Sequence, residues 1–355
     1  GSAYIFTRSG TSWSQQAKIV ADDAAGYDRF GISVAISGDY VIAGAYSDDD
    51  GASNSGSAYI FTRSGTSWSQ QAKIVADDPA ENDFFGSSVA IDGDYAIAGA
   101  YGDDPVGSAY IFIRSGTSWS QQAKIDGPHA WQSTLFGSSV SIDGDKAAVG
   151  AYYDTNVKGV AYIFKRSGTS WSQQSTIVAA DPTNGDEFGY SVSIDGDYVI
   201  AGAPANKYNA TVAGMAYIFR LDFKQQAKLV ADDAADSDRF GSSVSISGDY
   251  AIAGSKFDDN VGLNSGSAYI FIRDGTSWSQ QAKIVADDAA EGDRFGYSVA
   301  IVGDYAIVGA YFDDDAGNSS GAAYIFTRSG TSWSQQAKIV ASDAGVDDYF
   351  GISVA

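Results

Sequence analysis

Runs of aspartate are the residues in this chain whose type and spacing most clearly suggest chemistry. Carboxylates are hard oxygen ligands, and Ca²⁺ takes about six to eight of them. Adjacent Asp side chains diverge, so backbone carbonyls or nearby Asn oxygens must complete each shell. A solvated, charged loop that keeps the protein in solution is the alternative interpretation. The candidate metal ligands are Asp48, Asp49, Asp50, Asp258, Asp259, Asp313, Asp314 and Asp315.

A second set of candidate binding residues departs from the pattern of the rest of the chain. It includes the single histidine and several aromatic residues in loops that are less acidic than their equivalents. We expect these residues to form a ligand-binding patch, although sequence drift in tolerant loops would leave the same trace. The candidates are His129, Trp131, Tyr152, Tyr153, Lys158 and Tyr208.

The residue types needed for catalysis do not occur together. The chain has one His and no Cys, which excludes thiolate nucleophiles and thiolate metal sites. A lone His without a Ser or Cys partner pattern is a weak sign of catalysis. We therefore expect this protein not to be an enzyme.

These candidates lie within a repeated unit. Phe-Gly pairs recur 51 to 55 residues apart, and the copy that begins at Phe30 contains four short segments rich in β-branched and aromatic residues. The segments cover 33–36, 40–45, 57–62 and 68–76, with Gly-containing turns or an acidic loop between them. Four antiparallel strands repeated about seven times predict a β-propeller. A closed solenoid is the second choice.

The repeat resembles the FG-GAP repeat of integrin α-subunits and many secreted bacterial proteins. The FG of the name corresponds to Phe30-Gly31. The GAP corresponds to Ala43-Gly44-Ala45, and in one copy it is Gly202-Ala203-Pro204. The resemblance implies an all-β fold, a seven-bladed β-propeller of four-stranded antiparallel blades, forming one domain over 1–355. Blades are expected to start near 30, 85, 136, 188, 240 and 295, with a closing blade from 1–20 and 350–355.

The resemblance also implies a role. It suggests an extracellular binding or adhesion module that recognises a protein or glycan. Many members hold calcium between the first two strands, but here that connection is only Ser37-Gly38-Asp39. This connection is too short to surround a calcium ion at the family's usual position, and any Ca²⁺ is expected in the acidic runs.

Charge and hydropathy restrict the partners. The formal charge is −22, which argues against nucleic acid as a partner, and no apolar run is long enough to insert in a membrane. We expect a secreted or cell-surface protein. The alternative function is a structural subunit of an extracellular fibre or matrix that self-associates through repeated surfaces. The copy shared by the two ends of the chain lacks a second strand, and we expect this strand in sequence beyond residues 1–355. Donation of the strand by another chain is the alternative and would produce polymers.

Repeated side chains give three structural expectations. Six Trp at one repeat position, among them Trp68 and Trp119, are expected to pack against the neighbouring blade. The Lys of the Ser-Gln-Gln-Ala-Lys tract, such as Lys73, is expected to protect an exposed edge from aggregation. The Asp two places before most Phe-Gly pairs, such as Asp28, is expected to cap a turn.

Overall fold

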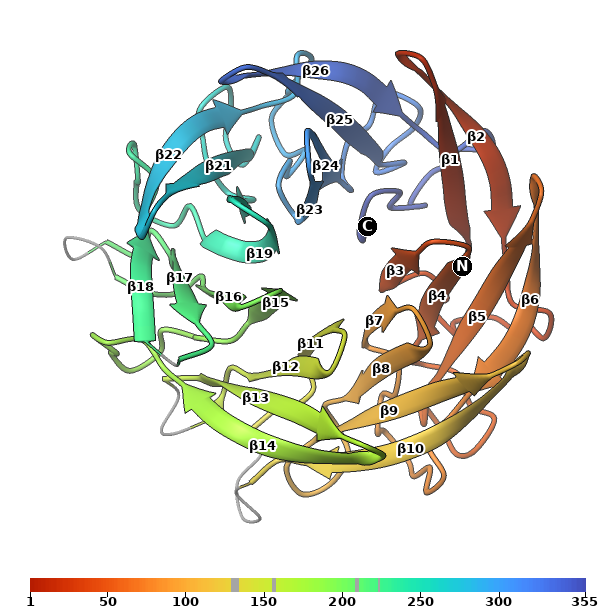
Figure 1. Ribbon diagram of the computed structural model, residues 1–355. Helices are drawn as coiled ribbons and strands as arrows, with labels where there is room; N and C mark the ends of the chain where they lie inside the picture. The colour runs from red at the N-terminus through yellow and green to blue at the C-terminus, as the bar shows by residue number, and fades with distance from the viewer. Residues whose placement is uncertain (129–133, 155–157, 208–210, 223) are drawn as a thin grey trace. The chain divides into compact units, whose positions relative to one another are not determined.

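Each complete copy of the repeat folds into one four-stranded antiparallel sheet. The computed structural model describes residues 1–355 except 129–133, 155–157, 208–210 and 223. Within each sheet the strands follow chain order, so every connection is a hairpin between neighbours. Figure 1 shows this order directly, for example from β7 to β10. The expected all-β fold built from four-stranded antiparallel blades is confirmed.

The chain divides into two compact units. The first comprises Gly1–Thr7, Ser14–Asn156 and Val160–Ile177, and the second comprises Arg8–Trp13, Val157–Gly159 and Val178–Ala355. The first unit holds three sheets and most of a two-stranded one. Its strands are β1 (Ala3–Ser9), β2 (Ser12–Ile19), β3 (Val34–Ser37), β4 (Tyr40–Ala45), β5 (Ser57–Ser64), β6 (Ser67–Ile74), β7 (Ser88–Asp92), β8 (Tyr95–Ala100), β9 (Ser108–Ser115), β10 (Ser118–Asp126), β11 (Ser139–Asp143), β12 (Lys146–Ala151), β13 (Val160–Ser167) and β14 (Ser170–Ile177).

The second unit holds the other three sheets. No strand is assigned within 350–355, where Phe350 forms a parallel bridge with Gly321. Among the described residues, no helix has the length and apolar character needed to span a bilayer. The strands of this unit are β15 (Ser191–Asp195), β16 (Tyr198–Ala203), β17 (Met215–Arg220), β18 (Lys224–Leu229), β19 (Phe240–Ser247), β20 (Tyr250–Ser255), β21 (Ser267–Asp274), β22 (Ser277–Ile284), β23 (Ser298–Val302), β24 (Tyr305–Ala310), β25 (Ala322–Ser329) and β26 (Ser332–Ile339).

The phenylalanine of a Phe-Gly pair fills the space between two successive sheets, as the pair at Phe85 shows. Phe85 is fully buried, and its ring centroid lies 5.4 Å from that of Tyr110 and 5.9 Å from that of Phe112. Ile42 and Ile60 of the preceding sheet belong to the same core cluster. Burial of these apolar surfaces is the main force that holds successive sheets together.

Two glycines allow the inner strands to approach each other closely. A Cβ atom on Gly44 would lie 1.9 Å from the carbonyl oxygen of Gly86, and one on Gly99 would lie 1.9 Å from that of Gly137. Both Gly86 and Gly137 belong to Phe-Gly pairs and have positive φ. The glycines of the repeat are therefore required by backbone-to-backbone contact.

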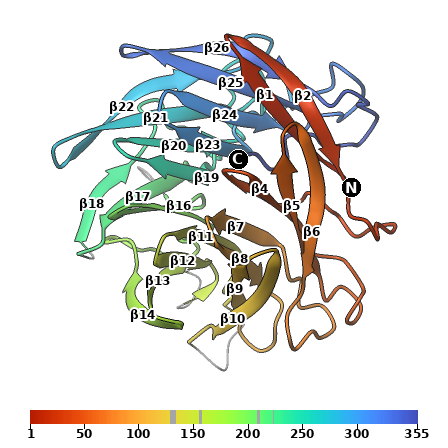
Figure 2. The same ribbon diagram turned by 45° about the vertical axis from the view of Figure 1, so that its right-hand side comes forward.

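A β-bulge allows a glutamine of the outer strand to bond with the next sheet. In the pairing of β5 with β6, Ile60 lies opposite Ala72 and Phe61 opposite Gln70, so Gln71 is the extra residue. Figure 2 shows these two long strands next to each other. The Gln71 side-chain oxygen accepts a hydrogen bond of 2.9 Å from the indole N–H of Trp119 in the following sheet. The expectation that these Trp side chains pack between blades is confirmed.

Candidate functional site

The acidic loop between the second and third strands is anchored by its first aspartate. In the loop between β4 and β5, Asp48 is only 4% exposed. Its Oδ2 accepts a hydrogen bond of 2.6 Å from the hydroxyl of Tyr59, and its Oδ1 accepts one of 3.0 Å from the backbone N–H of Asp50. Burial and the hydrogen bond to Asp48 raise the pKa of Tyr59. The hydroxyl therefore stays protonated and remains a donor.

The ammonium group of Lys73, from β6, enters the same site. Its Nζ lies 3.1 Å from Oδ2 of Asp48 and 2.7 Å from Oδ2 of Asp23, and it also pairs with Asp50. Burial by itself would lower the pKa of Lys73, but hydrogen bonds to Asp23, Asp50, Tyr59 and Asp48 raise it overall. The side chain is 19% exposed. The charge of this lysine is therefore paired inside the site, and its role in protecting an exposed edge from aggregation stays a prediction.

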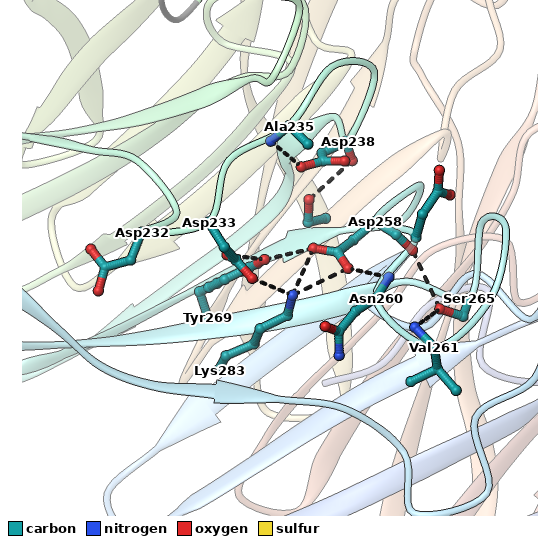
Figure 3. A network of polar contacts seen from close by, with 12 residues as sticks. Asp232, Asp233, Ala235, Asp238, Asp258, Asn260, Val261, Ser265, Tyr269 and Lys283 are labelled. Atoms are coloured by element: carbon teal, nitrogen blue, oxygen red, sulfur yellow. Dashed lines mark hydrogen bonds and ion pairs between the residues drawn. The ribbon is translucent and has the colours of Figure 1, made fainter.

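The same arrangement recurs in other copies, and Figure 3 shows one of them. Asp258 accepts a hydrogen bond of 2.6 Å from Tyr269, and Nζ of Lys283 lies 3.0 Å from Asp258 and 2.6 Å from Asp233. In each such group a Tyr and a Lys contact the first Asp of the acidic loop, and the Lys also contacts an Asp of the preceding loop. We call this group a lysine–carboxylate site. Two further examples centre on Lys124, with Asp78 and Asp103, and on Lys338, with Asp288, Asp313 and Asp315.

The structure separates the members of each predicted calcium run. The outer two, Asp48 and Asp50, have carboxylate oxygens within 4.8 Å of one another and of Asp23. Asp313, Asp315 and Asp288 form the equivalent group. Sequence reasoning missed Asp23 and Asp288, because each comes from the loop after the preceding fourth strand and reaches the site only through the packing of successive sheets.

The middle aspartates of the runs have local roles. Oδ1 of Asp49 accepts a hydrogen bond of 2.7 Å from the backbone N–H of Asn54, and Asp259 does the same at 2.7 Å for Asn264. The carbonyl of Asp314 accepts the backbone N–H of Gly317 at 3.1 Å. The expected divergence of adjacent Asp side chains is confirmed, and these residues shape the loop.

The carboxylate groups match calcium in charge and ligand type, but the lysine changes the site. The ammonium lies where Asp23, Asp48 and Asp50 converge. A divalent ion at that point would meet the positive charge of Lys73 at hydrogen-bonding range, so the two exclude each other. A calcium ion fits these residues only with the lysine side chain turned away.

Two copies depart from the composition of the lysine–carboxylate site. Thr176 stands at the lysine position of β14, and the buried Asp154 there accepts a hydrogen bond from Tyr162. In the next copy Asn206 replaces the buried Asp, and its side-chain amide donates to the hydroxyl of Tyr217 over 2.9 Å. The hydrogen bond between the tyrosine hydroxyl and the loop is thus present in both copies, although their charged residues differ.

The predicted aromatic patch is only partly visible. His129, Trp131 and Tyr208 lie outside the described residues. Tyr153 is 54% exposed, and its backbone N–H donates to the carbonyl of Thr134 over 3.3 Å. Tyr152 and Lys158 are half-buried, and Lys158 belongs to the second unit while the two tyrosines belong to the first. The patch remains a prediction.

A cluster of rings and cations in the second unit was not singled out from the sequence. Lys256 follows β20 directly, and its Nζ lies 4.8 Å from the ring centroid of Tyr297. The guanidinium carbon of Arg294 lies 4.4 Å from the centroid of Phe312. We call the group the Lys256 cluster; it contains Tyr190, Lys256, Phe257, Arg294, Tyr297, Tyr311, Phe312 and Tyr349.

Two positions whose residue type differs between copies mark this cluster in the sequence. The residue directly after the second strand is tyrosine in four other copies, proline at Pro204 and lysine only at Lys256. The four tyrosines are Tyr46, Tyr101, Tyr152 and Tyr311. The residue directly before each Phe-Gly pair varies in type but always has a left-handed backbone, with φ of 57° at Arg294. This conformation costs a non-glycine residue about 1–2 kcal/mol, and retained strain is typical of functional loops.

Comparisons with known proteins agree with the fold. The sequence profile described as FG-GAP repeat matches residues 13–61, 68–112, 119–164, 171–219, 223–271, 278–326 and 333–355. A comparison with curated proteins found no match. A chain in the solved structure titled "Crystal Structure of Mitotic Checkpoint Complex" is similar with a TM-score of 0.56 and 14% sequence identity, over 88% of this chain and 80% of that chain. This likeness concerns the fold alone.

Proposed function

Because the chain belongs to the FG-GAP repeat family, we propose that it is a non-catalytic binding or adhesion module. The protein that carries it is secreted or lies at the cell surface. Its blades form a seven-bladed propeller whose last blade combines both ends of the chain. Its ligand is a protein or glycan, and its long loops between second and third strands carry the recognition surface.

The observation that supports this function most is the bracing of those loops. Each lysine–carboxylate site fixes a loop from inside, as Asp48 does with Tyr59 and Lys73, while Asp49 and Gly51 at the loop tip stay exposed. A loop that is already ordered loses little conformational entropy when it binds a partner. Ordered loops on a rigid sheet are a common form of binding surface.

The protonation states of these sites fit binding better than acid–base catalysis. A general acid or base works best when its pKa is near the working pH. Burial raises the pKa of Tyr59, and the carboxylates around Lys73 raise the pKa of that lysine despite its burial. Both groups therefore keep their protons at neutral pH, and their chemistry is that of fixed hydrogen-bond donors.

The test is capture of the full chain on arrays of glycans and of extracellular-matrix proteins, with intact cells as a third surface. We expect saturable binding to at least one surface. Loss of binding on deleting the sector around Trp131 and Tyr153 would place the ligand there. Absence of binding to all three, together with concentration-dependent growth in light scattering, would favour the fibre subunit instead. Repeating the capture with Ca²⁺ or a chelator tests the calcium ligands.

A further inference from the structure

Lys256 differs from the other lysines that are held against aromatic rings in the second unit. Lys283 and Lys338 both bind carboxylates within hydrogen-bonding distance. Among the residues that the structure describes, no carboxylate lies within ion-pair distance of Lys256 or of Arg294. The Lys256 side chain is nevertheless half-buried, with Nζ 4.8 Å from the Tyr297 centroid, 5.5 Å from Phe257 and 5.8 Å from Tyr190.

The surroundings of Lys256 are electropositive in a strongly acidic chain. Arg239 and Arg294 are close enough to repel its charge, and Glu187 partly offsets them. That glutamate is itself paired with Arg239, at 2.9 Å. The only hydrogen bond of the Arg294 side chain among the described residues joins Nη1 to the hydroxyl of Tyr311, over 2.5 Å. The side chains of Lys256 and Arg294 can therefore still bind an anion.

The rings beside these cations lie against one another at tilted angles and are partly open to solvent. The centroids of Tyr297 and Tyr311 are 4.2 Å apart, and those of Tyr311 and Phe312 are 4.1 Å apart. Tyr190, Phe257, Tyr297 and Phe312 are all half-buried. Half-exposed rings next to cations can pack on the C–H face of a sugar while the cations bind its acidic group.

The backbone of the cluster favours a saccharide over a peptide strand. The N–H groups of Phe257, Arg294, Tyr297 and Phe312 donate to the carbonyls of Asp238, Asn264, Arg294 and Asp293 in turn. A peptide that binds by adding a strand needs free backbone donors and acceptors, and these residues offer no free N–H group. Recognition here therefore depends on rings and cationic side chains.

We propose that the Lys256 cluster binds an acidic saccharide, with its carboxylate or sulfate held by Lys256 and Arg294 and its ring faces packed on Tyr297 and Phe257. This rests on the proposed binding function and names its ligand class. The equivalent position in the first unit carries Tyr101, with Phe84 stacked on it at 5.2 Å and no lysine. The Tyr-to-Lys difference between copies is what provides an anion site.

The experiment is calorimetric titration of the full chain with three hexasaccharides of similar length, one uronate, one sulfated and one neutral. We expect the acidic sugars to bind and the neutral one to bind at least about tenfold more weakly, because one hydrogen bond to a charged group is worth that much. A uronate preference and a sulfate preference identify which acidic group the site takes.

Three variants separate the site from general charge. Lys256→Tyr restores the residue of other copies, so we expect it to fold and to lose about tenfold in affinity for the acidic sugar. Lys256→Arg should retain binding. Lys165→Tyr removes an exposed cation of β13 and should leave binding unchanged. Melting temperatures report folding, and Arg294→Leu, which restores the residue type of Leu135 in another copy, is the second variant if Lys256→Tyr unfolds.

Several outcomes would overturn the inference. One is a loss of affinity in Lys165→Tyr as large as that in Lys256→Tyr. Another is a neutral sugar that binds as tightly as the acidic ones. The third is an oligoglutamate peptide that binds as tightly as the acidic sugars and no longer binds to Lys256→Tyr. If no acidic sugar binds while the chain still captures a protein or neutral glycan surface, the inference fails and the proposed function stands. If nothing is captured at all, both fail.

Discussion

The Nζ atom of Lys73 lies 3.1 Å from Oδ2 of the buried Asp48, and the two residues come from the outer strand and the acidic loop of one sheet. This pair compensates a carboxylate that is only 4% exposed. A buried charge is costly unless it is paired. The lysine therefore contributes to stability and at the same time holds the place that a metal ion would take.

Lys73→Met tests both roles. Loss of the ammonium leaves Asp23, Asp48 and Asp50 converging without a cation, so we expect the free energy of unfolding to fall by roughly 3 kcal/mol. Millimolar Ca²⁺ should restore much of this loss in the variant and have little effect on the parent chain. Urea unfolding with and without Ca²⁺ measures it, and Lys165→Met is the control. A variant that is as stable as the parent without Ca²⁺ would contradict the prediction.

Asp293→Asn should stabilise the protein at neutral pH. Burial, with a smaller effect from Asp313, raises the pKa of Asp293 to about 6, although the Ala290 N–H donates to it over 2.7 Å. A carboxyl whose pKa is raised in the folded state makes the fold less stable as pH rises from about 4 to about 6. One pKa unit is worth about 1.4 kcal/mol, so we expect a gain of roughly 1–3 kcal/mol above pH 6 and none below pH 4.

The control for this experiment is Asp288→Asn, which should act in the opposite direction. Burial would raise the pKa of Asp288, but Lys338 and Tyr324 lower it overall. Its stabilising effect is present above the ordinary pKa and is lost as pH falls. Urea unfolding at several pH values between 4 and 8 compares the two. If the free energy of unfolding changed with pH in the same way in both variants, the causes assigned to the two pKa shifts would be ruled out.

Tyr27→Gly should raise stability by removing backbone strain. Tyr27 is 94% exposed with φ of 74°, and glycine already stands at the equivalent positions Gly185 and Gly292. Relief of a left-handed backbone exceeds the entropy cost of glycine, so we expect a gain of about 0.5–1 kcal/mol. Tyr153→Gly, at an exposed tyrosine without positive φ, should lose a similar amount. Thermal unfolding distinguishes them, and a loss in both would be inconsistent with strain.

Gly99→Ala should strongly destabilise the first unit. The new methyl group would lie 1.9 Å from the carbonyl oxygen of Gly137, and backbone on both sides leaves it no space. We expect a loss of roughly 3 kcal/mol or more. Gly93→Ala, with open space around it but φ of 55°, should lose only about 1 kcal/mol. Equal losses in the two variants would show that the contact is not limiting.

Affinity for the acidic hexasaccharide should fall as pH rises from 7 to 9. Burial lowers the pKa of Lys256 to about 8, helped by Arg239 and Arg294 and opposed by Glu187. A neutral amine cannot pair with an anion, so binding weakens as the proton leaves. Tyr190, Phe257 and Tyr297 complete the groups that face it. Lys256→Arg should bind independently of pH over this range, and a pH-dependent decline in that variant would assign the effect elsewhere.

Much of the fold could be predicted from the copies themselves. The second strand 40–45 agrees with β4 residue for residue, and the packing of Phe85 follows from its position beside a glycine. Strand ends were less accurate, since β5 extends to Ser64 beyond the expected end at 62. These features depend on local pattern, which repeats in every copy and so can be read many times.

The site residues were harder to predict because each site combines different copies. Asp23 meets Lys73 only after two sheets pack, and Tyr190 and Tyr297 lie in the copies on either side of Lys256. Sequence pattern showed that the lysines recur but not that their side chains turn inward. A single Lys in place of Tyr carries little information until its neighbours are known.

The bulged glutamine that binds the tryptophan of the next sheet also affects how copies depend on one another. Gln71 and Trp119, like Gln281 and Trp333, join consecutive copies through one repeated contact. Such chains unfold with nearest-neighbour coupling, so that damage in one copy weakens the copies that adjoin it. The same uniformity makes an added or deleted copy compatible with whatever precedes and follows it. Duplication of a whole repeat in the gene therefore supplies each new copy with its contacts to the neighbouring copies already present.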